Sequence, residues 1–130
     1  MSQTEPLMPY RALVTVVDDD DSVREAMPYL LRELGYAAAA FSSAAEFLAS
    51  DALLHTDCLM LDIAMPGMSG PELHAELLRR GLAIPVIFIT ARVEDKDRGA
   101  LEKSGVVACL IKPFGEEALE TALKAALTGT

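Results

Sequence analysis

The chain has no tryptophan, only 2 cysteines, and no apolar run that approaches the roughly 18 residues needed for a membrane-spanning helix. The opening MSQTEPLMPYR lacks the basic start and apolar core of a secretion signal. We therefore expect a soluble, cytoplasmic protein with no membrane partner. Cys58 and Cys109 both lie in apolar, strand-like runs, where cysteine usually packs as a small hydrophobic residue, so neither indicates a metal site.

Positive charge is also scarce, because 11 Lys and Arg residues face 20 Asp and Glu residues, which leaves a net charge of -9. This is the wrong sign for neutralising nucleic-acid phosphates, so we expect no direct nucleic-acid binding. The dinucleotide-binding glycine pattern, the P-loop pattern and the nucleophile elbow are all absent. His55 and His74 lack the spacing of metal ligands, and we expect both to be solvent-exposed.

What the chain does have is a length of 130 residues with 52% hydrophobic content, which fits a single domain. We expect this domain over residues 11–128, after an extension over residues 1–10. Four apolar runs are continuous, as is typical of strands buried on both faces: ALVTVV (12–17), CLML (58–61), VIFI (86–89) and VVACLI (106–111). The small side chains of YAAAAF (36–41) give a weaker signal, but its place between two helices fits an edge strand.

Helical patterns with apolar residues three and four positions apart separate these runs. The segments are residues 23–34, 42–53, 70–81 and 119–127. Gly81 is the expected end of the third segment. Residues 92–104 are the weakest helix candidate, because Gly99 lies inside the segment. The alternation of strands and helices predicts one doubly wound α/β domain with a parallel sheet.

In open parallel sheets, ligands bind beyond the carboxyl ends of the strands. The residues at these ends are Asp18, Asp19, Asp62, Thr90 and Lys112. Crowded carboxylates raise one another's pKa unless a cation neutralises them, and Mg²⁺ prefers oxygen ligands of this kind. The sequence therefore predicts a Mg²⁺ site formed by the three acids. Asp62 is then the candidate nucleophile for a phosphoryl group, with Thr90 and Lys112 to stabilise the phosphoryl oxygens.

Structural roles would also explain several of the polar residues in and around this predicted site. Asp20 or Asp21 is expected to cap the helix that follows the first strand, and Ser22 with Glu25 fits a capping box. The threonine and the lysine, taken alone, fit a polar strand end and a solvated side chain. Their joint placement at strand ends favours the functional interpretation.

Four segments, VVDDD, LMLDIAMPGMSG, FITA and LIKPF, together resemble the signatures of the response-regulator receiver domain, in order and at normal separations. The resemblance covers Leu13 to Leu127, and the separation from Thr90 to Lys112 is similar to that in nitrogen-fixation regulators. It implies a flavodoxin-like five-stranded sheet of order 2-1-3-4-5 with helices on both faces. It also implies a receiver in a two-component system rather than an enzyme.

The resemblance implies that Asp18 and Asp19 hold the metal and that Asp62 is the phosphoacceptor. It also implies that Thr90 is the switch hydroxyl and that Lys112 is the lysine that pairs with the phosphate. The backbone carbonyl of Ala64 would be a further ligand for Mg²⁺. The implied partner is a sensor histidine kinase, from which Asp62 takes the phosphoryl group before the surface changes. A downstream output domain or protein and a phosphorylation-dependent homodimer are further partners that the family allows. The bond before Pro113 is commonly cis in this family.

Cys109 stands three residues before Lys112, where the family usually has an aromatic ring. A cysteine is too small to fill the space that an inward movement of Thr90 would vacate. We therefore expect activation to pass mainly through residues 91–104.

Two other functions fit parts of the sequence. Haloacid-dehalogenase-like phosphatases also have spaced aspartates after a strand, as in Asp18 and Asp20 here, but they need a fourth acidic motif beyond the lysine. A phosphoryl group on Asp18 rather than Asp62 would identify that class. A flavin-binding module of the same fold would need aromatic and Ser/Thr-rich loops, which the sequence lacks.

Overall fold

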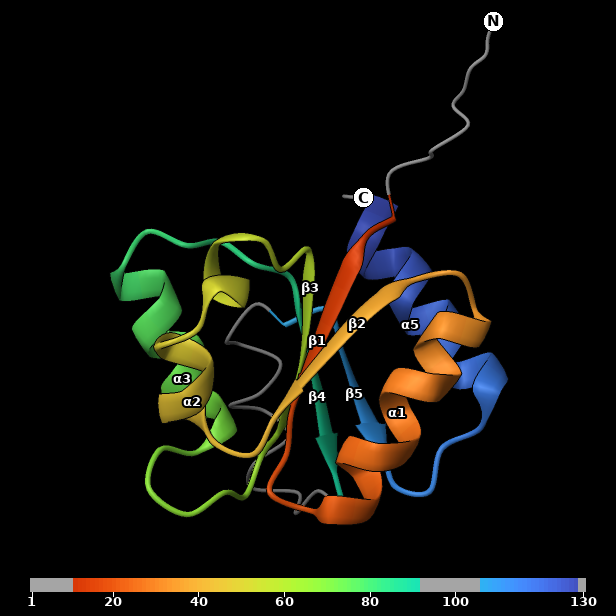
Figure 1. Ribbon diagram of the computed structural model, residues 1–130, viewed down its shortest axis with the longest axis horizontal. Coiled ribbons are helices and arrows are strands. Elements are labelled where there is room, and N and C mark those ends of the chain that lie inside the picture. The colour runs from red at the N-terminus through yellow and green to blue at the C-terminus, as the bar shows by residue number, and fades with distance from the viewer. Residues whose placement is uncertain (1–10, 92–105, 129–130) are drawn as a thin grey trace, which may run out of the picture.

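The computed structural model describes residues 11–91 and 106–128, which contain one sheet of five parallel strands (Figure 1). The strands are β1 (Leu13–Val17), β2 (Ala37–Phe41), β3 (Cys58–Asp62), β4 (Val86–Thr90) and β5 (Ala108–Ile111). Their order is β2-β1-β3-β4-β5, and each neighbouring pair is parallel. The predicted strand order is therefore confirmed.

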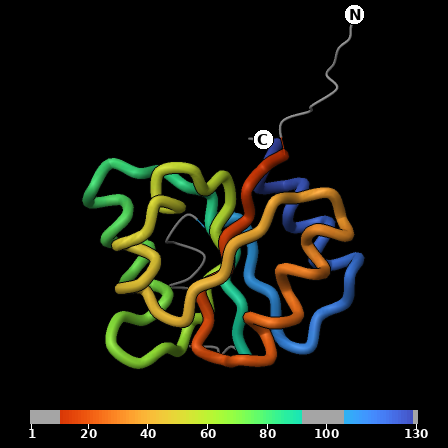
Figure 2. Tube along the Cα trace, viewed as in Figure 1, coloured from red at the N-terminus to blue at the C-terminus, as the bar shows by residue number. Residues whose placement is uncertain are grey.

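Helices cover both faces of this sheet. They are α1 (Asp21–Glu33), α2 (Ala44–Leu48), α3 (Gly70–Arg79), α5 (Glu116–Thr128) and a short 3₁₀ helix, η1 (Asp51–Leu54). Figures 1 and 2 show α1 and α5 on one face, and α2 and α3 on the other, which confirms the flavodoxin-like architecture. The predicted weak helix at 92–104 and the extension at 1–10 lie outside the described residues. Within the described residues, every helix is too short or too polar to cross a membrane.

The central strands alternate between two hydrophobic cores, because successive side chains of a strand point to opposite faces. Met60 and Ile89 belong to the core beneath α1 and α5, whereas Leu61 and Phe88 belong to the core beneath α2 and α3. Strands β1, β3 and β4 are buried almost throughout, as their continuous apolar runs predict. Strand β5 is only half-buried, since it is an edge of the sheet.

The two cysteines pack in different cores. Cys58 on β3 belongs to the core beneath α1 and α5, whereas Cys109 on β5 packs against the other core. No disulfide joins them, and both lie within the described residues. Burial raises the pKa of the Cys58 thiol to about 12, so this side chain stays a neutral hydrophobic group.

Side-chain caps define the starts of α1 and α3. Asp20 caps α1, because its carboxylate accepts a hydrogen bond of 2.9 Å from the backbone N–H of Ser22. The predicted capping box of Ser22 and Glu25 is wrong, since Ser22 already lies inside the helix. A capping box does occur before α3, where Ser69 and Glu72 bond to each other's backbone N–H groups.

The prediction that His74 is solvent-exposed is wrong, although His55 is exposed as expected. His74 is 6% exposed, and its ring meets that of Phe88 edge-on, with centroids 6.1 Å apart. The reason is helical periodicity: Leu77, three residues later, shares its face of α3 and packs into the core. Burial lowers the pKa of His74, so the ring resists protonation.

His74 should make the protein less stable in mild acid. The unfolded chain gains a proton near pH 6.5 while the buried ring resists it, so stability falls as the pH drops below about 6.5. Relative to His74→Leu, the wild type should lose up to about 1.4 kcal/mol per pH unit of unfolding free energy. Urea unfolding at about pH 7.5 and about pH 5.5 measures this difference, with His55→Leu as the exposed control. An equal response of the wild type and His74→Leu would contradict it.

Gly70 begins α3 directly against the end of β3. A Cβ at this position would come closer to the Asp62 carbonyl oxygen than real Cβ atoms do, and would lie 3.1 Å from the Ile63 Cα. The Gly70 N–H also donates to the Ile63 carbonyl at 3.1 Å. Close packing of α3 on the backbone of Asp62 therefore requires glycine here.

Replacing Gly70 with alanine should lower the unfolding free energy by about 2 kcal/mol, because overpacking outweighs the better helix propensity of alanine. Gly115→Ala is the matched control, since nothing lies within 4 Å of a Cβ built at Gly115. The control should change stability by less than about 0.5 kcal/mol in urea denaturation. Equal stabilities of the two variants would show that the backbone of Asp62 gives way easily.

Candidate functional site

The strand order brings the predicted site residues to one edge of the sheet. Strand β3 ends at Asp62 and β4 ends at Thr90, and the two strands are neighbours. Asp18 and Asp19 directly follow β1 on the other side of β3, and Lys112 directly follows β5. Because all five strands are parallel, these residues share the carboxyl edge.

Three carboxylates converge at this edge. Asp18, Asp19 and Asp62 each offer one oxygen, and these oxygens lie within 4.8 Å of one another. Asp18 is fully buried and Asp62 is 7% exposed, whereas Asp19 is exposed. Burial, and then the negative charge of Asp18, raise the pKa of Asp62 to about 7, although Lys112 opposes the shift. Asp62 is therefore partly protonated near neutral pH unless a further cation compensates the charge of the cluster.

The donor set of this cluster suits a hard divalent cation. It consists of carboxylate oxygens, without the nitrogen or sulfur ligands that zinc favours. The exposed Asp19 leaves one side open to water, which Mg²⁺ commonly keeps in its coordination shell. The residues present therefore fit Mg²⁺.

Asp18 is held through all of its polar groups. Its N–H donates to the Phe41 carbonyl at 3.1 Å, and its own carbonyl accepts from Arg24 Nη1 at 2.9 Å. One carboxylate oxygen accepts from the Asp20 N–H at 2.9 Å, and the other accepts from Lys112 Nζ at 2.9 Å. These partners come from β2, from the start of α1 and from the chain after β5, so three parts of the fold fix one side chain.

Lys112 is part of the site rather than a solvated lysine. Its side chain is 23% exposed, and it forms an ion pair with the buried Asp18. Burial acts to lower the pKa of Lys112, but the hydrogen bond to Asp18 and the charges of Asp18 and Asp62 raise it overall. The ammonium group is therefore charged at neutral pH. The Lys112–Pro113 peptide bond is cis, as the resemblance implies.

Backbone contacts place the remaining two predicted residues. Thr90 is 6% exposed, and its carbonyl accepts a 2.7 Å hydrogen bond from the Lys112 N–H, which joins the ends of β4 and β5. Ala64 is exposed and follows Ile63, whose N–H donates to the Ile89 carbonyl at 3.0 Å. The chain after Asp62 is therefore anchored to β4 before it turns towards α3.

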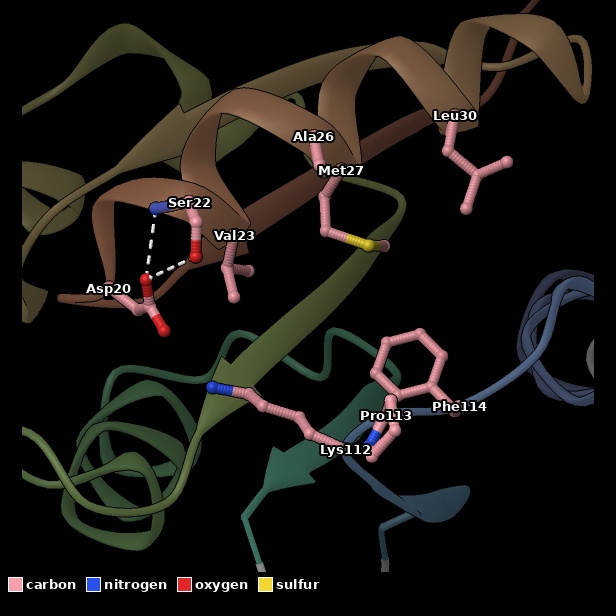
Figure 3. Close-up of a pocket in the computed structure, with 9 residues that line it drawn as sticks. All are labelled: Asp20, Ser22, Val23, Ala26, Met27, Leu30, Lys112, Pro113 and Phe114. Atoms are coloured by element: carbon pink, nitrogen blue, oxygen red, sulfur yellow. Dashed lines mark hydrogen bonds between the residues drawn. The ribbon is translucent and has the colours of Figure 1, made fainter.

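A pocket with a cavity volume of about 410 Å³ adjoins Lys112 (Figure 3). Its polar end contains Asp20 and Lys112. Its apolar lining comes from α1 and the chain before α5, namely Val23, Ala26, Met27, Leu30, Pro113 and Phe114. The lysine of the site thus borders an apolar surface built largely from α1.

Two residues beside the site were not predicted from the sequence. Arg24 binds the Asp18 backbone, and Gly70 packs on the Asp62 backbone. A glycine at the start of an expected helix is a weak signal of close packing. No local pattern points to Arg24, because its contact depends on how α1 leaves the end of β1.

A family model described as the response regulator receiver domain matches residues 14–124. Nodulation protein W of Bradyrhizobium diazoefficiens is 40% identical over 116 residues, which cover 89% of this chain and 51% of that protein. Transcriptional regulatory protein FixJ of Azorhizobium caulinodans is 39% identical over 120 residues, which cover 92% of this chain and 57% of that protein. The chain thus spans about half the length of the curated relatives that it matches.

Solved structures agree with these matches. The crystal structure of FixJ-N has a TM-score of 0.83 and 30% identity, with 93% of this chain and 97% of that chain covered. A response regulator receiver protein from Burkholderia phymatum has a TM-score of 0.78 and 40% identity, with 91% and 96% covered. Both matches cover nearly the whole of a receiver structure. This chain therefore belongs to the response-regulator receiver domain family of two-component signalling, and it is not a conventional enzyme.

Proposed function

We propose that this chain is a phosphoacceptor in which Asp62 receives a phosphoryl group from a phosphohistidine of a sensor histidine kinase. The main support is the position of Asp62, whose carboxylate lies with two other carboxylates at the carboxyl edge of a receiver fold. The raised pKa of Asp62 shows that burial and like charge are concentrated at this residue.

Asp18, Asp19 and Asp62 would hold Mg²⁺, with the backbone carbonyl of Ala64 as a further oxygen ligand. When bound, the ion would offset the negative charge of the carboxylates and of the phosphoryl oxygens. The many hydrogen bonds to Asp18 would keep one ligand in place before the metal binds. Pre-positioned ligands of this kind lower the conformational cost of binding.

The transfer forms one bond and breaks one. A carboxylate oxygen of Asp62 attacks phosphorus, while the bond from phosphorus to the kinase histidine breaks and leaves its electron pair on the imidazole nitrogen. The Lys112 ammonium and the Thr90 hydroxyl then donate to the phosphoryl oxygens. Lys112 donates to Asp18 in the structure, so its ammonium group would have to leave or share this carboxylate.

The phosphoryl group on Asp62 would draw Thr90 inwards and change the surface of the domain. An output domain or protein would read this change, and a phosphorylation-dependent homodimer would be a second way to read it. The matched residues make up only 51% and 57% of these two curated relatives, and FixJ is a transcriptional regulatory protein. We place the domain in the cytoplasm with its kinase and expect it to bind no nucleic acid directly.

The proposal predicts that Asp62 alone carries the phosphoryl group. With Mg²⁺ and acetyl phosphate, the wild-type chain should gain one phosphoryl group by intact mass, and Asp62→Asn should gain none. Asp51→Asn, which changes an exposed carboxylate on η1, should behave as the wild type. Chelation of Mg²⁺ should prevent labelling in every variant.

Peptide mapping distinguishes this proposal from an aspartate-nucleophile phosphatase. A label on Asp18 rather than Asp62 would favour the phosphatase. Equal labelling of Asp62→Asn and the wild type would show that the phosphoacceptor is a different residue.

A second prediction separates the role of Lys112 from that of the metal ligands. Lys112→Met should slow phosphorylation about 100-fold, because a charged donor to the phosphoryl oxygens is lost. The same change should leave Mg²⁺ affinity unchanged or make it tighter, because the lysine competes for an Asp18 oxygen. Lys124→Met, on the exposed face of α5, is the matched control. Weaker Mg²⁺ binding by Lys112→Met would show that the lysine supports the metal site.

A further inference from the structure

Arg24 contacts the backbone of Asp18, one of the three residues of the carboxylate cluster. Its Nη1 donates a 2.9 Å hydrogen bond to the backbone carbonyl of Asp18, and its Nη2 pairs with the Asp21 carboxylate. The Arg24 side chain is 24% exposed, whereas that of Asp21 is 86% exposed. The hydrogen bond to the Asp18 carbonyl is therefore partly buried, whereas the ion pair with Asp21 is exposed to solvent.

The same residue closes the turn between β1 and α1 at two points. The Arg24 backbone N–H donates to the Asp20 carbonyl at 3.1 Å, while the side chain reaches back to the Asp18 carbonyl. Within this turn, the Asp20 N–H binds the Asp18 carboxylate at 2.9 Å. Arg24 thus connects the first turn of α1 to the backbone that carries Asp18 and Asp19.

Charge and geometry predict opposite effects of Arg24 on a cation bound at the cluster. A guanidinium group bound to the Asp18 backbone carbonyl repels a divalent cation at the Asp18 carboxylate, so its charge alone weakens binding. A hydrogen bond that fixes the ligand backbone strengthens binding, because the carboxylates are then oriented before the metal arrives. Removal of Arg24 therefore tests which of the two effects is larger.

We propose that Arg24 is a positioning residue for the divalent metal, and that it acts by holding the Asp18 carbonyl so that Asp18 and Asp19 face Asp62. This inference rests on the proposed function, because it requires the cluster to bind Mg²⁺. A planar guanidinium can serve the carbonyl and the Asp21 carboxylate at once, which a lysine ammonium does less well.

The test is a titration of the whole chain with Mn²⁺, followed by the EPR signal of unbound Mn²⁺, with Mg²⁺ as the competitor. The chain has no tryptophan, so tryptophan fluorescence cannot report binding. Arg24→Met should weaken binding of both ions about tenfold, although a positive charge is removed. Arg32→Met is the matched control, since it makes the same change at an exposed position in the last turn of α1, and it should bind as the wild type.

Unchanged or tighter binding by Arg24→Met would overturn the inference and show that the charge of Arg24 dominates. Arg24→Lys should give intermediate affinity, because one donor to the carbonyl is retained. If Arg24→Met fails to fold in a thermal unfolding control, Arg24→Lys decides, and wild-type affinity in that variant would overturn the inference. Failure of the wild type to bind either ion would instead count against the proposed function itself.

Discussion

The buried charge of Asp18 is the constraint on which the rest of the site depends. A carboxylate with no solvent exposure needs a partner, and it finds one in Lys112 at 2.9 Å. The two residues are 94 positions apart in the chain, and their strands are separated by β3 and β4. The ion pair therefore forms only when β1, β3, β4 and β5 are assembled side by side. Burial and the nearby charge of Asp18 raise the pKa of Asp62, and the charge of Lys112 only partly opposes this rise.

Both helical layers contact the backbone of the site. Arg24 of α1 binds the Asp18 carbonyl from one layer, and Gly70 of α3 packs against the Asp62 carbonyl from the other. A movement of Asp18 or Asp62 would thus shift the contacts of α1 and α3, which lie on opposite faces of the sheet. This gives a physical basis for signalling at the surface, since packed elements move as units rather than deforming gradually.

Periodicity in the sequence predicted the elements well where packing and pattern agreed. Strands β1, β3 and β4 are buried on both faces, as their continuous apolar runs indicate, and Asp20 caps α1 as one of two expected residues. Predictions were wrong where a polar residue has a tertiary role. His74 looked like a surface residue, but it shares a helix face with Leu77 and meets Phe88 on β4. A histidine has an apolar ring as well as a polar edge, so composition alone does not decide its burial.

The sequence by itself determined the fold class, the strand order through its family signatures, and the set of polar residues at the strand ends. The fold class and the strand-end residues follow from local patterns and from the parallel arrangement of strands. The strand order came instead from the resemblance to receiver domains. Only the tertiary structure decided which residues are in contact with those at the strand ends. The pairing of Lys112 with Asp18, the hold of Arg24 on the Asp18 carbonyl and the close approach of Gly70 to Asp62 all join distant or differently directed segments. Such contacts depend on side-chain reach and on helix orientation, which no spacing of residues along the chain encodes.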